Sequence, residues 1–255
     1  LHYRRSFWLL IIGLCHAYLL WAGDILVAYA LCAFLVYWFR TIRPSRQLAI
    51  GLLLIAVPSL IMLAGYVSLE QWPDASVEDF MADWRPSEAQ IDAELAAYRG
   101  GWLSQMDMRV PQALELQTFA FFFWSLWRAS GLMLVGMALF TWGVLTAERS
   151  KRFYARLAAI GLLIGVPVVA YGALRNTAGG WELAYSRFGP GFQLNYWGSL
   201  LISSAYIALV MLFCLWGGLP RLRLALAAVG RTALTNYLLQ TILATAIFYG
   251  FGLGL

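Results

Sequence analysis

Three ionisable side chains interrupt the long apolar stretches of this sequence and could do chemistry: His16, Asp24 and Arg128. An ionisable group inside hydrocarbon is costly, so each one is a candidate functional residue. A histidine can act as a general base near neutral pH, and a carboxylate can orient it or bind a substrate amine or hydroxyl. We therefore predict that His16 and Asp24 are catalytic.

The spacing between His16 and Asp24 leaves two geometries open. If one helix continued through both, they would lie on the same side, ~12 Å apart along the axis, too far for a hydrogen bond. If the chain reverses at Gly23, Asp24 could fold back toward the histidine. The alternative to function is that His16 bonds a backbone carbonyl and Asp24 caps a second helix that starts at Ile25.

Arg128 lies within a long apolar stretch, ten residues beyond Thr118. We expect its side chain to face the protein interior, where it pairs with a carboxylate or binds an anionic group of a substrate. Asp24 is the expected partner, and a purely structural ion pair is the alternative. The small residues after Arg128 favour close helix packing; they include Gly131, Gly136 and Gly143.

Two amides near the C-terminus, Asn236 and Gln240, lie one helical turn apart in the segment GRTALTNYLLQ. They share a face, so we predict that they bind substrate in a polar cavity, with hydrogen bonding between helices as the alternative. Metal and cofactor sites are not indicated. The three cysteines, which show no metal-ligand spacing and are expected to be buried thiols, are Cys15, Cys32 and Cys214.

The composition indicates a membrane protein of the all-α class. Hydrophobic residues make up 62% of the chain and charged residues 12%, against about 25% charged residues in soluble domains. A spanning helix needs about 20 apolar residues. Seven stretches reach or approach that length, and we predict a single transmembrane domain (residues 1–255) with about seven spans: residues 6–21, 25–39, 47–67, 118–145, 153–174, 195–217 and 232–255.

The positive charges follow the positive-inside rule, which explains the net charge of +5 without nucleic acid as a partner. With a cytoplasmic N-terminus, five basic residues fall outside and Arg128 falls within a span. Twelve fall inside: Arg4, Arg5, Arg40, Arg43, Arg46, Arg149, Lys151, Arg152, Arg156, Arg221, Arg223 and Arg231.

Residues 68–115 form the one sizeable polar insertion, predicted to be extracytoplasmic. Ser87 and Gln90 form a capping-box pattern, and Gly100 and Gly101 follow as a stop signal. We expect a short amphipathic helix between them, acting as a lid or as a packed connector. The chain starts at Leu1 and stops within an apolar run, so we expect a fragment of a longer protein.

Four segments resemble the YeiB-like family of bacterial inner-membrane proteins, known as domain of unknown function 418. They are the hairpin from Leu9 to Leu31, Tyr98-Arg99-Gly100-Gly101, the run from Gly131 to Leu145, and VGRTALTNYLLQ. The resemblance implies a multi-pass inner-membrane protein. That family is similar to membrane acyltransferases of the acyltransferase-3 and heparan-glucosaminide types, in which an embedded histidine takes part in acyl transfer. The resemblance matches His16 to that histidine.

The leading hypothesis is a membrane acyltransferase-like protein. Its partners would be the lipid bilayer, an acyl donor, and a polar or lipid-linked acceptor. Asn236 would stabilise the developing oxyanion. The alternatives are a transporter or export factor, in which the same residues line a pathway, and an accessory membrane subunit without catalysis.

Overall fold

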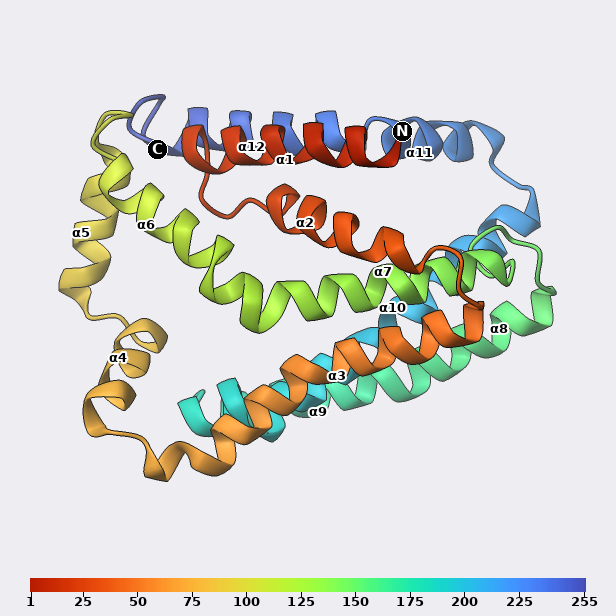
Figure 1. Cartoon of the computed structure of the whole chain (residues 1–255), viewed down its shortest axis with the longest axis horizontal. Helices are drawn as coiled ribbons and strands as arrows, with labels where there is room; N and C mark the ends of the chain where they lie inside the picture. Colours follow the sequence, from red (N-terminus) through yellow and green to blue (C-terminus); the bar gives the residue numbers. More distant parts are fainter. The chain divides into compact units, whose positions relative to one another are not determined.

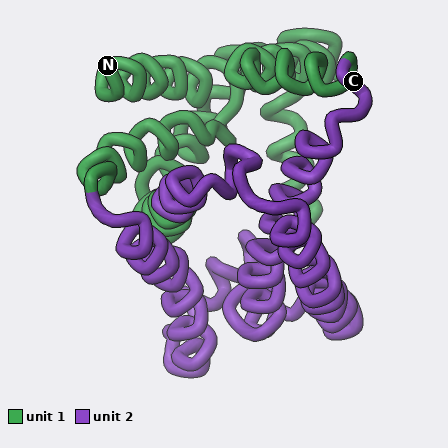
Figure 2. The backbone as a smooth tube through the Cα atoms, turned by 90° about the vertical axis from the view of Figure 1, so that its right-hand side faces the viewer, with its two compact units in different colours: residues 1–41, 85–133, 221–255 green, residues 42–84, 134–220 purple.

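The computed structural model describes residues 1–255, and its regular elements are all helices (Figure 1). The chain divides into two compact units, each made of separate segments (Figure 2). Unit 1 comprises residues 1–41, 85–133 and 221–255, and unit 2 comprises residues 42–84 and 134–220. Helix α7 (Leu126–Thr141) runs from unit 1 into unit 2.

Unit 1 holds the predicted hairpin and the C-terminal helix. Its helices are α1 (His2–Leu19), α2 (Leu26–Val36), α5 (Glu88–Arg99), α6 (Met106–Gln117), α11 (Pro220–Arg231) and α12 (Ala233–Phe248). Helices α1 and α2 pack directly on each other. A small core of Ala17, Ala22 and Ala113 connects α1, its following loop and α6.

Unit 2 is built around one long helix. Its helices are α3 (Pro44–Ser68), α4 (Asp74–Trp84), α8 (Lys151–Ile160), α9 (Val166–Ala178) and α10 (Pro190–Trp216). A π-helical turn, η4 (Gly161–Gly165), joins α8 to α9, and all three pack against α10. Close packing depends on glycine: a Cβ on Gly161 would lie 2.4 Å from the Leu201 carbonyl oxygen.

Four helical segments are long and apolar enough to cross a membrane: Pro44–Gln71, Met106–Thr141, Lys151–Ala178 and Ala184–Trp216. They match four of the seven predicted stretches. The other three stretches form the shorter helices α1, α2 and α12. Of these, α1 carries two arginines in its first turns. The structure thus supports an all-α membrane protein, and both the number of spans and the cytoplasmic N-terminus stay predictions.

The second of these segments starts earlier than the sequence suggests. The predicted apolar stretch starts at residue 118, and the residues before it include the charged side chains of Asp107, Arg109 and Glu115. Helix α6 nevertheless continues through a π-helical turn, η3 (Phe121–Ser125), into α7.

The predicted amphipathic helix is α5. Its capping box is present: the Gln90 amide donates to Ser87 Oγ at 3.3 Å, and the Ser87 amide donates to Gln90 Oε1 at 2.8 Å. The helix ends before Gly100, as the sequence predicts. Glycine packing differs from expectation, because a Cβ on Gly136 would meet nothing within 4 Å. Tight glycine contacts lie instead in η4, at Gly161 and Gly165, and in α1, at Gly13.

Candidate functional site

The α1–α2 hairpin reverses the chain within a six-residue loop, residues 20–25. Helix α1 ends where the amides of Leu20 and Trp21 both donate to the His16 carbonyl at 3.0 Å. The two helices then approach closely, because a Cβ on Gly13 would lie 2.7 Å from the Val27 amide nitrogen. The reversal carries Asp24 back toward His16, the second of the two geometries that the sequence leaves open.

His16 and Asp24 form a buried pair at hydrogen-bond distance. Histidine Nδ1 lies 2.8 Å from Asp24 Oδ1, and each side chain is 1% exposed. The other carboxylate oxygen, Oδ2, accepts a hydrogen bond from the Val27 amide at 2.8 Å. The aspartate therefore caps the first turn of α2 and holds the imidazole at the same time.

This arrangement leaves one nitrogen of His16 available. When the proton lies on Nδ1, beside the carboxylate, Nε2 is the basic atom. Nε2 is buried and has no hydrogen-bond partner in the protein. Burial raises the pKa of the Asp24 carboxyl, in the connecting loop, whereas the Val27 amide and His16 act in the opposite direction.

Two aromatic residues enclose the imidazole. Tyr237 of α12 lies with its ring centroid 5.0 Å from that of His16, and its hydroxyl is 3.5 Å from Asp24 Oδ1. The same hydroxyl accepts a hydrogen bond from the Ile25 amide at 3.4 Å. Trp21 meets the imidazole edge-on at 6.4 Å. Tyr237 was not predicted from the sequence, although it directly follows Asn236 in the C-terminal segment.

Arg128 lies on the same hollow as Asp24. This hollow, here named the Arg128 hollow, has a volume of about 740 Å³. The guanidinium lies over the Trp124 ring at 5.8 Å from its centroid. The lining is otherwise mostly apolar and includes Leu9, Tyr29 and Leu132. A cation in an apolar hollow suits a ligand that carries both a negative group and a chain.

Gln240 lines a second hollow of about 400 Å³, here named the Gln240 hollow. Trp21 and Tyr237, which enclose His16, belong to its wall. Asp24 therefore lines the Arg128 hollow, whereas the two aromatic rings that enclose His16 line the Gln240 hollow. Asn236 lies apart from them: its amide donates to the Val229 carbonyl at 3.3 Å and to Thr232 Oγ1 at 3.2 Å.

A buried arginine that sequence reasoning placed in an outer loop supports this site. Arg109 of α6 is 0% exposed. It donates to the Leu19 carbonyl at 3.3 Å and to Gln105 Oε1. Trp102 donates to the same carbonyl at 2.8 Å. A cation at the last carbonyl of α1 suits the negative end of that helix, only three residues beyond His16.

The C-terminal turn closes over the Tyr98 segment. The Gly250 amide and Gln105 Nε2 both donate to the Tyr98 carbonyl at 2.9 Å. The rings of Tyr98 and Tyr249 lie 4.8 Å apart. Burial raises the pKa of the Tyr98 phenol, so this hydroxyl stays protonated near neutral pH. The Tyr98 hydroxyl donates to Gln112 Oε1 at 2.7 Å, and the Tyr249 ring packs against the Tyr98 ring. The structure gathers no cluster of His, Cys, Asp and Glu side chains that could hold a metal ion.

The sequence of this chain is similar to one family of known proteins. The profile described as "Protein of unknown function (DUF418)" matches residues 139–255. The chain is 32% identical to the uncharacterized protein YeiB of Escherichia coli over 96% of its length, and 28% identical to the uncharacterized protein YxaH of Bacillus subtilis over 100%. It spans 62% and 60% of those two relatives. No solved structure matches.

Proposed function

We propose, from the premise that this chain belongs to the YeiB-like family of unknown function (DUF418), that it is part of an acyl-transferring protein of the bacterial inner membrane. The acceptor is a polar or lipid-linked molecule. The single observation that carries the proposal is the buried His16–Asp24 pair, whose aspartate lines one hollow and whose enclosing rings, Trp21 and Tyr237, line a second. Acyl transfer needs this arrangement, because the donor and the acceptor must both reach the same base.

The pair can activate a hydroxyl or an amine. Nε2 of His16 removes the acceptor proton while the acceptor oxygen or nitrogen attacks the acyl carbonyl carbon. The new bond forms, the bond from the acyl carbon to the donor breaks, and the same proton passes from Nε2 to the leaving group. Asp24 holds the Nδ1 proton and stabilises the transient imidazolium.

Each hollow is assigned one substrate. The Arg128 hollow suits the donor, because its guanidinium can bind an anionic part and its apolar wall can take an acyl chain. The Gln240 hollow suits the acceptor, because the Gln240 amide and the Thr241 hydroxyl can bind hydroxyl groups. We no longer assign Asn236 to the oxyanion, because its amide bonds at the α11–α12 junction.

Transfer of a labelled acyl group from acyl thioesters to membrane lipids and sugars, by the purified full-length protein, tests the proposal. We expect His16→Gln to lower the rate by about 100-fold or more, the usual contribution of a positioned base. Cys15→Ala is the matched control, since Cys15 is the exposed neighbour of His16 on α1. Equal rates for wild type and His16→Gln, or no transfer by wild type, would contradict the proposal.

A further inference from the structure

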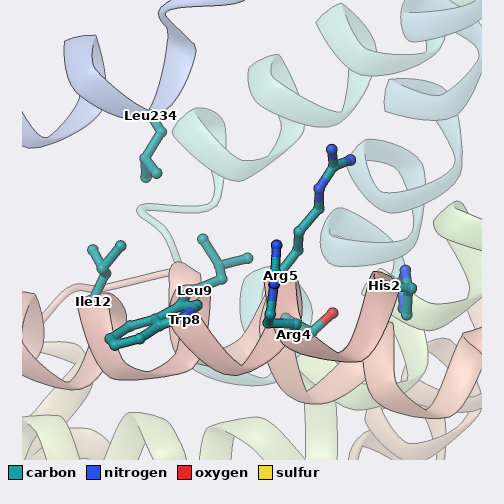
Figure 3. A pocket seen from close by; sticks show the side chains of 8 residues that line it. His2, Arg4, Arg5, Trp8, Leu9, Ile12 and Leu234 are labelled. Carbon is teal, nitrogen blue, oxygen red and sulfur yellow. The ribbon is translucent and has the colours of Figure 1, made fainter.

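A third hollow of unit 1 lies along the first three turns of α1 and has a volume of about 680 Å³ (Figure 3). This hollow shares one lining residue, Leu9, with the Arg128 hollow, and none of its other lining residues belongs to that hollow. One end carries two arginines, Arg4 and Arg5, and the other end is apolar. Figure 3 shows Arg5 extending from α1 and Leu234 of α12 directed toward Leu9 and Ile12.

The two arginines have no partner in the protein. Arg4 and Arg5 are both exposed, and neither makes a hydrogen bond, an ion pair or a ring contact through its side chain. Other exposed arginines of the chain do find partners: Arg40 donates to the Tyr37 carbonyl at 3.2 Å, and Arg149 donates to the Trp142 carbonyl. Two adjacent uncompensated guanidinium groups attract an anion, and phosphate oxygens match their donor geometry.

The opposite end of the hollow suits a hydrocarbon chain. Its wall consists of Trp8, Leu9, Ile12 and Leu234, of which Trp8 is 58% exposed and Leu234 is 39% exposed. An indole beside arginines is typical of the interface between headgroups and acyl chains. Basic pockets between helices commonly bind the headgroups of anionic lipids.

We propose that this hollow binds one anionic phospholipid, with its phosphate between Arg4 and Arg5 and one acyl chain along Leu9, Ile12 and Leu234. The net negative charge of the headgroup decides the class, because a zwitterionic lipid carries a positively charged ammonium group that offsets its phosphate. The site requires that the protein lie in a membrane, as proposed above, but it does not require acyl transfer.

Native mass spectrometry of the full-length protein, equilibrated with equal amounts of phosphatidylglycerol and phosphatidylcholine, tests this site. The measured quantity is the ratio of the two lipids in the singly bound population. We expect phosphatidylglycerol to dominate in wild type, and Arg4→Gln and Arg5→Gln to lower the ratio by about fivefold each. The control removes two exposed charges elsewhere, Lys151→Gln with Arg152→Gln, and should leave the ratio unchanged.

A second variant separates a phospholipid from a bare phosphate. Leu234→Trp fills the apolar end and leaves both arginines in place, so it should reduce the bound lipid several-fold. An unchanged ratio in the arginine variants would overturn the proposal, as would an equal loss in the Lys151 and Arg152 control or unchanged lipid binding in Leu234→Trp. Because the readout is lipid retention, its failure is distinct from a failure of the acyl-transfer proposal.

Discussion

Unit 1 and unit 2 bury different kinds of polar group. In unit 2 the buried polar side chains are neutral, and four polar side chains bond to one another: Ser59 Oγ donates to Gln193 Oε1 at 2.5 Å, and Ser186 donates to Asn176 Oδ1 at 3.2 Å. In unit 1 they include His16, Asp24 and Arg109, which carry or share charge. Neutral pairs connect helices at little cost, whereas buried charges are expensive to desolvate.

This difference between the buried polar groups of the two units indicates which unit holds the functional residues. The neutral bonds of unit 2 accompany glycine contacts that bring α8, η4 and α9 against α10, so they are explained by packing. The charges of unit 1 are not explained by packing alone, because an apolar residue would fill the same space at lower cost. We therefore expect the chemistry in unit 1 and only a structural, scaffold role for unit 2.

The largest expected change in stability comes from the buried cation of unit 1. Arg109→Ala removes two charge-assisted bonds and leaves a cavity beside the end of α1, so the free energy of unfolding should fall by about 3 kcal/mol. Thermal unfolding of the detergent-solubilised full-length protein measures this. Arg99→Ala, at an exposed position of α5, should change stability by less than about 0.5 kcal/mol. Equal effects in the two variants would remove the special role of Arg109.

A smaller loss of stability is expected from a substitution at Gly161, where the helices of unit 2 lie in close contact. Gly161→Ala pushes a methyl group against the Leu201 carbonyl and should cost about 1–3 kcal/mol. Gly136→Ala, in the same unit, adds a methyl group in open space and should be neutral or stabilising by up to about 1 kcal/mol. The comparison breaks if Gly161→Ala lowers acyl transfer per folded molecule as strongly as His16→Gln does.

The smallest change concerns a single neutral hydroxyl of unit 2. The Tyr154 hydroxyl donates to the carbonyls of Gly143 and Val144, at 3.2 and 2.8 Å, in a fully buried position. Tyr154→Phe should cost about 1–2 kcal/mol, because both carbonyls lose this donor. Tyr206→Phe, exposed on α10, should cost close to nothing. If Tyr154→Phe instead abolished transfer without loss of stability, unit 2 would not be a scaffold only.

The sequence singles out candidate residues but does not predict their geometry. His16, Asp24 and Arg128 are visible because an ionisable group within an apolar stretch needs a reason. Whether His16 and Asp24 touch depends on the reversal of residues 20–25 and on the close approach at Gly13, which no helical periodicity reveals. The capping box of α5 is predicted correctly because it depends only on neighbours in sequence.

Residues that act through long-range contacts escape such reasoning. Tyr237 is one of 13 tyrosines, and only the folded chain brings it to Asp24, 213 residues earlier in the sequence. Arg109 lies between acidic residues and looks like a loop cation, yet it is buried against the end of α1. Asn236 is assigned to a cavity from its helical face, but its amide finds nearer partners one turn away.

The central claim is that His16 and Asp24 act as one unit, and a double-mutant cycle on acyl transfer tests it most directly. The variants are His16→Gln, Asp24→Asn and both together; asparagine keeps an oxygen for the Val27 amide, so the cap on α2 survives. If the residues act together, the double variant should be about as slow as the slower single variant. If the fold-losses of transfer rate in the two single variants multiply to give the loss in the double variant, the two residues act independently, and that result would contradict a joint role.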